Sequence, residues 1–224
     1  MFAEPENRTK VKICGLTTLE DARFASGALA DYLGFIFFPD SPRHIEPAKA
    51  GAIINWIEGP EKVGVFVNQP MDDVNSIARQ TGIDLVQLHG NESPEYCSLV
   101  DKPVIKAFHV GDVTTAADLK KEIYPYLDAV EFLLFDTKTT DLWGGTGTSF
   151  NWEILTEISQ DKPFFLAGGL HNGNITKAIQ SVHPDVVDLS SGVESSPGIK
   201  DFDKVEQFFE TMREIWEQQE MGEF

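Results

Sequence analysis

The stretch VKICGLTTLEDARFASGALADYLGFIFF, residues 11–38, decides the fold that the sequence predicts. Apolar runs at residues 11–14 and 31–37 are typical of buried strands, and residues 18–27 between them have the spacing of a helix. The same order of strand, turn and helix recurs along the chain. Strands are predicted at residues 11–14, 31–37, 62–68, 84–88, 104–108, 130–135, 163–167 and 186–190.

Segments with helical spacing fill the intervals between these strands. They lie at residues 18–27, 47–56, 71–80, 94–100, 115–124, 152–159, 174–181 and 201–218. Eight alternating pairs favour an α/β fold, a closed (β/α)8 TIM barrel in a single domain, with an open doubly wound sheet as the alternative. We expect the barrel to span residues 10–218, between flexible termini at residues 1–9 and 219–224.

The composition indicates a globular protein with an acidic surface. The 224 residues include 36 Asp and Glu against 18 Lys and Arg, a formal net charge of −18. Such a charge repels nucleic-acid phosphates and anionic lipids, so we expect neither nucleic acid nor a membrane as a partner. Two cysteines are few for a disulfide-stapled secreted domain, and the first residues lack the apolar segment of a signal peptide, which favours the cytoplasm.

Alternation along two strands places a thiol and a carboxyl group at the same end of the barrel. Lys12 and Cys14 share the inward face of the first strand, and Asp136 ends the inward face of VEFLLFDT. Barrel enzymes carry their reactive groups at this end. Cys14 and Asp136 are therefore candidates for a base and an acid. The alternatives are a small buried hydrophobe for Cys14 and a turn cap for Asp136.

Three more polar side chains are expected at the same rim. In DLVQLHG, the inward pair Gln87 and His89 alternates with apolar residues that face the helices. Arg43 follows the second strand in SPRH, and its guanidinium can bind a carboxylate through two parallel N–H groups. The alternatives are a solvated loop arginine and a histidine that bonds a loop carbonyl.

The last two strands continue into FLAGGL and VVDLSSGVESSPG, which are rich in small residues. Barrels often bind phosphate here, between the loops after strands 7 and 8 and a short extra helix, which we expect to start near residues 193–196. Ordinary turns are the alternative. A lid-like loop at residues 136–151 carries further glycines, with an ordinary surface loop as the alternative. The predicted phosphate-binding residues are Gly147, Gly168, Gly169, Ser190, Ser191 and Gly192.

Eight segments together resemble the phosphoribosylanthranilate isomerase family in order and spacing over residues 11–203. They are VKICGLT, GFIFFPDSPRHI, VGVFVN, DLVQLHG, LLFDT, GGTGTSFNW, LAGGL and VDLSSGVESSPGIKD. The family is a (β/α)8 barrel of tryptophan biosynthesis that converts N-(5-phosphoribosyl)anthranilate to 1-(2-carboxyphenylamino)-1-deoxyribulose 5-phosphate. The resemblance implies an Amadori rearrangement of a small phosphosugar by general acid–base catalysis, with no cofactor and no metal.

The resemblance also implies roles for individual residues. Cys14 in KICG would remove the sugar C2 proton, and Asp136 in LLFDT would protonate the ring oxygen. A thiolate base needs a lowered pKa, and inward Lys12 is a candidate to lower the pKa of Cys14. The implied substrate-binding residues are Arg43 at the anthranilate carboxylate, Gln87, His89, and Asp188 at a sugar hydroxyl.

The lid departs from the family pattern GGTGKTFDW, because Thr148 stands at the lysine position and Ser149 and Asn151 replace Thr and Asp. We expect altered phosphate affinity or lid dynamics before lost chemistry. The competing functions are another phosphosugar barrel, such as the histidine-pathway isomerase, and a non-catalytic barrel. Cys14 in place of an aspartate disfavours the first, and the presence of both Cys14 and Asp136 disfavours the second. Monomer and homodimer are both compatible with the sequence.

Overall fold

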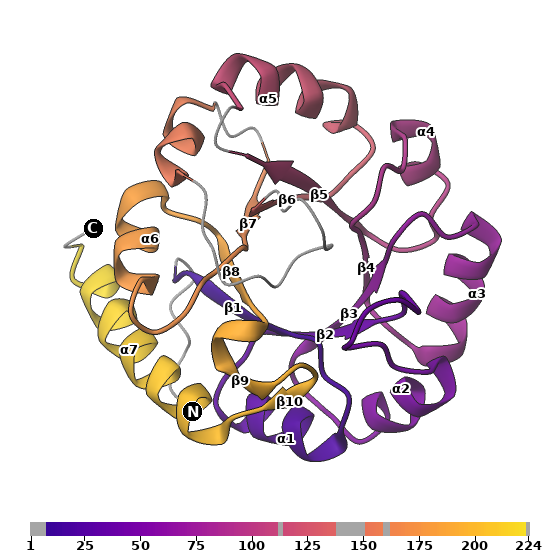
Figure 1. Ribbon diagram of the computed structural model, residues 1–224, viewed down its shortest axis with the longest axis horizontal. Coiled ribbons are helices and arrows are strands. Elements are labelled where there is room, and N and C mark those ends of the chain that lie inside the picture. The colour runs from indigo at the N-terminus through magenta and orange to yellow at the C-terminus, as the bar shows by residue number, and fades with distance from the viewer. Residues whose placement is uncertain (1–7, 112–113, 138–150, 159–161, 223–224) are drawn as a thin grey trace.

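The chain folds into a closed barrel of eight parallel strands, as the alternation in the sequence predicts (Figure 1). The computed structural model describes residues 8–111, 114–137, 151–158 and 162–222. The strands are β1 (Lys10–Cys14), β2 (Tyr32–Ile36), β3 (Glu61–Phe66), β4 (Leu85–Leu88), β5 (Val104–Val110), β6 (Phe132–Thr137), β7 (Phe164–Leu166) and β8 (Val186–Leu189). Because β1 pairs with both β2 and β8, the sheet closes, and the open doubly wound alternative is wrong.

Helices form a ring outside the strands (Figure 1). The α-helices are α1 (Leu19–Gly27), α2 (Pro47–Ile54), α3 (Met71–Thr81), α4 (Pro94–Cys97), α5 (Ala116–Ile123), α6 (Ile175–Val182) and α7 (Phe202–Glu220). Short 3-10 helices are η1 (Tyr124–Tyr126), η2 (Trp152–Glu157) and η3 (Ser191–Val193). Side-chain caps fix several helix starts, since Thr18 accepts from the amide of Asp21 and Ser93 accepts from the amide of Tyr96.

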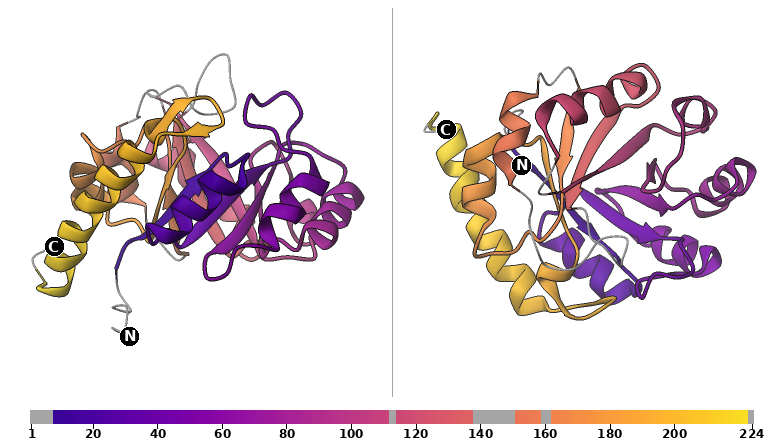
Figure 2. Two further views of the ribbon diagram at one scale, coloured as in Figure 1. Left: turned by 90° about the horizontal axis from the view of Figure 1, so that it is seen from below. Right: turned by 45° about the horizontal axis from the view of Figure 1, so that its top comes forward.

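Two predicted helices differ from the structure. The segment at residues 152–159 contains the 3-10 helix η2 in place of an α-helix. The short extra helix expected to start near residues 193–196 lies slightly earlier, as the 3-10 helix η3. An antiparallel hairpin of β9 (Glu194–Ser196) and β10 (Ile199–Lys200) occupies the segment after it. Its turn contains Pro197 and Gly198, and Gly198 has a φ of +82° that favours glycine. Figure 2 shows this hairpin at one end of the barrel, away from the start of β1.

The core has two layers, as expected for a barrel. A large cluster of apolar side chains packs between the strands and the outer helices. A smaller cluster fills the inside of the barrel and consists of Tyr32, Val63, Leu85, Ile105, Ala107, Leu134, Phe165, Ala167 and Val186. This inner layer closes the barrel below the C-terminal ends of the strands. A site built at the C-terminal ends of the strands therefore lies above this layer.

Contacts at both ends extend the folded barrel slightly beyond the expected boundaries. Arg8 forms an ion pair with Asp31 at 2.7 Å, and the indole of Trp216 donates to the carbonyl of Thr9. Gln219 bonds to both the backbone and the hydroxyl of Thr9. Residues 8, 9 and 219, expected in flexible termini, thus belong to the packed structure. Among the described residues, no helix is long and apolar enough to cross a membrane.

Candidate active site

One pocket at the C-terminal ends of the strands gathers most of the side chains that the sequence predicted for the site. Among the predicted residues, those that line it are Cys14, Arg43, Gln87, His89, Asp136, Gly168, Gly169, Asp188, Ser190 and Ser191. Gly192 does not line the pocket, and Gly147 lies outside the described residues, as does most of the predicted lid. Strand parity therefore placed distant segments correctly at one end of the barrel.

Cys14 ends β1 beside a fully buried cation. The Lys12 ammonium lies inside the barrel, 2.7 Å from the carboxylate of Asp188 and 2.8 Å from the amide oxygen of Gln87. A side chain on Gly34 of β2 would come within 2.7 Å of the Cys14 sulfur, so this glycine leaves room for the thiol. The thiol thus occupies a tight, polar corner of the pocket.

Lys12 acts to lower the pKa of Cys14, as expected, but the net shift of this pKa is upward. Burial raises the pKa of the thiol, and this effect outweighs the opposing charge of Lys12. Asp188 contributes to the rise, because its carboxylate also repels a thiolate. Cys14 is consequently protonated at neutral pH when the pocket holds no substrate.

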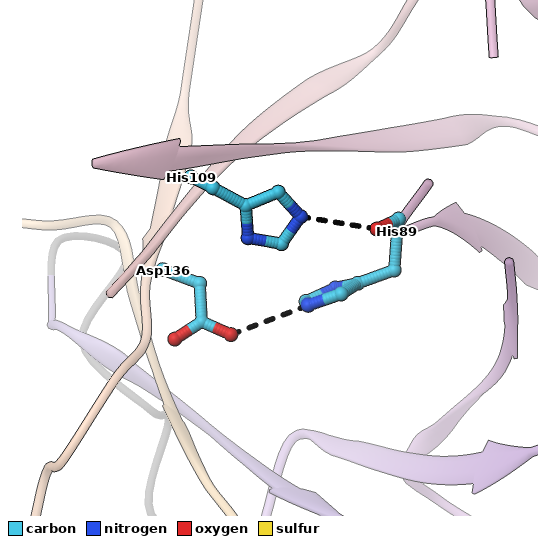
Figure 3. Close-up of side chains that lie close together, drawn as sticks. All are labelled: His89, His109 and Asp136. Atoms are coloured by element: carbon cyan, nitrogen blue, oxygen red, sulfur yellow. Dashed lines mark hydrogen bonds and ion pairs between the residues drawn. The ribbon is translucent and has the colours of Figure 1, made fainter. Parts of the chain in front are cut away.

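Asp136 ends β6 and is held at both carboxylate oxygens. The amide of Thr137 donates to Oδ1 at 2.7 Å, and the imidazole Nε2 of His89 lies 3.2 Å from Oδ2 (Figure 3). Burial by itself would raise the pKa of Asp136, but the hydrogen bond from His89, together with His109 and the amide of Thr137, outweighs it and holds this pKa below its usual range. Asp136 is therefore a carboxylate at neutral pH in the unliganded protein.

The hydrogen-bond chain from Lys12 determines the tautomer of His89. Since the Lys12 ammonium can only donate, the oxygen of the Gln87 amide faces it, and the nitrogen of that amide faces Nδ1 of His89 at 3.0 Å. Nδ1 then accepts, so Nε2 carries the hydrogen and donates it to Asp136. A continuous polar chain connects Asp188, Lys12, Gln87, His89 and Asp136.

A group of three side chains could in principle hold a metal ion. One atom each from His89, His109 and Asp136 lies within 4.8 Å of the others. A histidine that binds metal through one nitrogen normally donates a hydrogen from the other to an acceptor. Here Nδ1 of His89 faces the amide nitrogen of Gln87, which is itself a donor. The arrangement suits a hydrogen bond to Asp136 and does not fit a metal ligand.

Arg43 is clamped by a residue that the sequence analysis missed. Its Nε and Nη2 donate to the carboxylate of Glu194 at 2.9 Å and 2.7 Å, and both side chains are buried. Its Nη1 makes no hydrogen bond to any described residue. Because Arg43 lines the pocket, the outer edge of its guanidinium is available to a carboxylate ligand. The dipeptide of Pro197 and Gly198 is typical of a turn, and it could have predicted the hairpin that carries Glu194.

Lys200, also missed, connects three parts of the site. Its ammonium donates to the carbonyl of Cys14 at 2.6 Å, to the carbonyl of Ser190 at 3.3 Å and to Glu194 at 2.8 Å. Burial lowers the pKa of Lys200, and this effect outweighs the attraction of Glu194. The β9–β10 hairpin therefore fixes the end of β1, the loop after β8 and the Arg43 clamp relative to one another.

Glycines bring the loops after β7 and β8 close together. A side chain on Gly192 would come within 2.0 Å of the carbonyl of Leu170, and Gly168 and Gly169 have φ angles of +85° and +65°. The hydroxyl of Ser190 is buried and has no hydrogen-bond partner among the described residues. These loops thus form a small cradle with polar groups that face the pocket.

The fold and the pocket define a class of protein. A closed parallel barrel with titratable groups and glycine-rich loops around one pocket at the C-terminal strand ends has the architecture of the (β/α)8-barrel enzymes. The family profile described as "N-(5'phosphoribosyl)anthranilate (PRA) isomerase" matches residues 11–211. The chain belongs to the N-(5'-phosphoribosyl)anthranilate isomerase family.

Individual relatives agree with this membership. An N-(5'-phosphoribosyl)anthranilate isomerase from Geobacter metallireducens is 48% identical over 200 residues, which cover 89% of this chain and 96% of that protein. The crystal structure of phosphoribosyl anthranilate isomerase from Thermotoga maritima has a TM-score of 0.83 and 37% identity, and covers 92% of this chain and 99% of that one. A third structure, with a TM-score of 0.80, 35% identity and the same coverage, is a complex with reduced 1-(o-carboxyphenylamino)-1-deoxyribulose 5-phosphate.

Proposed function

We propose that this chain converts N-(5'-phosphoribosyl)anthranilate to 1-(2-carboxyphenylamino)-1-deoxyribulose 5-phosphate, the third step of tryptophan biosynthesis from chorismate. Family membership supports this activity. The observation that carries it is the single pocket in which Cys14 and Asp136 accompany Arg43 and Ser190. An aldose–ketose isomerisation of a substrate with a carboxylate and a phosphate requires one acid, one base and two anion-binding ends.

The reaction balances with these two titratable groups and water. Asp136 donates a proton to the furanose ring oxygen, the C1–O bond breaks, and C1 becomes the protonated imine of anthranilate. Cys14, as the thiolate, then removes the proton from C2. The electron pair of that bond forms an enolamine. Its C1 then takes a proton from water and its C2 hydroxyl gives one to water, so that C2 becomes a ketone. C1 is reduced and C2 is oxidised within the substrate, so the step needs no outside oxidant or reductant.

Polar atoms without partners support the substrate contacts. The Oδ1 atom of Asp188 and the hydroxyl of Ser190 are buried without a hydrogen-bond partner among the described residues, and both residues line the pocket. Unsatisfied buried polar atoms are costly, so a ligand that bonds to them is favoured. Asp188 accepts a hydrogen bond from a sugar hydroxyl. Ser190, with the backbone of Gly169 and Ser191, holds the phosphate.

An assay of purified protein tests the proposal directly. We expect loss of the fluorescence of the anthranilate adduct when N-(5'-phosphoribosyl)anthranilate is added. The aminoaldose substrate of the histidine pathway serves as the comparison, because that reaction uses the same type of barrel. Turnover of the histidine-pathway compound alone would contradict the proposal, and tight binding of product without turnover would show a non-catalytic barrel.

The pKa directions predict the pH profile. The dominant form of the unliganded protein has its proton on Cys14, whereas catalysis requires it on Asp136. Both forms contain the same number of protons, so their ratio does not change with pH between the lowered pKa of Asp136 and the raised pKa of Cys14. Apart from the ionisation of the substrate phosphate, which has a pKa of about 6, we expect kcat/KM to be nearly constant from about pH 5 to about pH 8. It falls at lower pH because both groups are protonated, and at higher pH because neither is. An inflection near neutrality would contradict this assignment.

Arg43→Ala is expected to weaken binding of a product analogue by about 2–4 kcal/mol, the scale for loss of a desolvated charged hydrogen bond. An analogue that lacks the carboxylate should lose almost no affinity. Calorimetry on the folded variant measures both values. Arg79→Ala is the matched control, because Arg79 pairs with Asp101 on the exposed surface. Equal losses for the two analogues would mean that Arg43 only supports its loop through Glu194.

A further inference from the structure

After each turnover of the proposed reaction, Asp136 lacks the proton that it needs as an acid and Cys14 carries a proton that it must lose to act as a base. Asp136 has given its proton to the sugar oxygen, and Cys14 has gained one from C2. Before the next turnover, Asp136 must be protonated again and Cys14 must release its proton. Asp136 is buried, with only 6% of its surface exposed. A route that carries protons from solvent to this carboxylate is therefore needed, an argument that rests on the proposed function.

His109 stands beside Asp136 on the neighbouring strand. β5 and β6 are paired so that His109 lies opposite Asp136 in the register. Nε2 of His109 lies 3.1 Å from the carbonyl of His89, an acceptor, so Nε2 carries a hydrogen and donates it. Figure 3 shows the other ring nitrogen, Nδ1, turned toward the carboxylate of Asp136. One atom each from His89, His109 and Asp136 lies within 4.8 Å of the others, so His109 can pass a proton to Asp136 directly or through one water.

His109 also has the access that Asp136 lacks. His89 and Asp136 are buried, whereas His109 is partly exposed. Both His89 and Asp136 line the substrate pocket, and His109 is not among the described residues that line it. A substrate in the pocket contacts the lining residues His89 and Asp136 and does not need to cover His109. Protons can then reach the carboxylate without passing through the occupied pocket.

We propose that His109 is the proton relay that reprotonates Asp136 between turnovers. A solvent or buffer acid gives a proton to Nδ1 of His109, and that proton passes to an oxygen of Asp136. The thiol of Cys14 returns its proton to solvent, so the cycle balances. His109 acts on the substrate only through Asp136.

The charges around His109 suit a group that passes its proton on. Burial lowers its pKa, and the neighbouring charges of His89 and Lys106 act in the same direction. The carboxylate of Asp136 and the carbonyl of His89 oppose them without reversing the shift. His109 is therefore mostly neutral at neutral pH and holds an added proton only briefly. Transfer of that proton to Asp136 restores the acid that the proposed reaction consumes.

His109→Gln tests the relay, because a glutamine amide can still donate to the carbonyl of His89 but cannot carry a proton. In dilute buffer at neutral pH we expect kcat to fall by about tenfold or more, less than the 10²–10⁴-fold typical of a direct acid or base. Added imidazole should restore kcat in the variant and have no effect on the wild type. KM should change little. His183→Gln, at the exposed end of α6, is the matched control and should behave as the wild type.

The outcomes separate this proposal from the proposed function. Unchanged kcat in His109→Gln, or a reduced kcat that no small acid restores, would overturn the relay and leave His109 with a structural role at His89. Either result is compatible with full wild-type turnover, so the isomerase activity would still stand. Absence of turnover in the wild type would instead contradict the proposed function.

Discussion

Cys14→Ser should lower kcat by about 10²–10⁴-fold, the range for removal of a general base. A serine hydroxyl has a much higher pKa than a thiol and is almost never ionised at neutral pH. The tight contact with Gly34 accommodates the smaller oxygen, and the backbone carbonyl that receives the Lys200 ammonium is unchanged. The fold and the substrate affinity should therefore be preserved. Steady-state kinetics and binding of a product analogue measure the two effects separately.

The second cysteine is the natural control for this experiment. Cys97 ends α4, is buried away from the pocket and has a pKa that burial raises to about 11. Cys97→Ser should leave kcat and KM close to those of the wild type. If Cys14→Ser retains more than about a tenth of the wild-type kcat, a loss too small for a general base, Cys14 is not the base.

Asp136→Asn should lower kcat by about 10²–10⁴-fold, because an amide cannot protonate the ring oxygen. The structure shows that this change is less conservative than its shape suggests. Thr137 donates to one oxygen of Asp136 and His89 donates to the other. Whichever way the new amide turns, its NH₂ group faces a donor. The chain from Lys12 through Gln87 also prevents His89 from presenting an acceptor.

This donor clash predicts a second measurable effect of Asp136→Asn. One buried donor loses its partner, which should reduce the free energy of unfolding by about 1–3 kcal/mol. Unfolding in denaturant measures the loss of stability. Steady-state kinetics at denaturant concentrations below the unfolding transition measure the loss of kcat. Asp101→Asn, in the exposed pair with Arg79, is the matched control and should change neither. A variant that is destabilised but turns over normally would show that Asp136 is structural.

The local pattern of apolar and turn residues was enough to predict the barrel fold and the ends of its strands. The apolar segment at residues 11–14 and its seven successors predict strands within a residue or two of those observed, since alternation and turn residues act over short distances. Strand parity likewise placed Cys14, Gln87 and Asp136 in one pocket, because parallel strands in a barrel all end on the same side. These features depend on geometry that each segment carries by itself.

Tertiary structure decided which groups meet and what that does to them. Arg43 contacts Glu194 151 residues further along the chain, and Lys12 contacts Asp188 176 residues further along. No local pattern contains such a pairing. The sequence suggested that Lys12 would lower the pKa of Cys14, but burial reverses that direction, since desolvation depends on everything packed around the sulfur. The position of His109 beside Asp136 follows from the pairing register of β5 and β6, which the sequence of either strand alone does not determine.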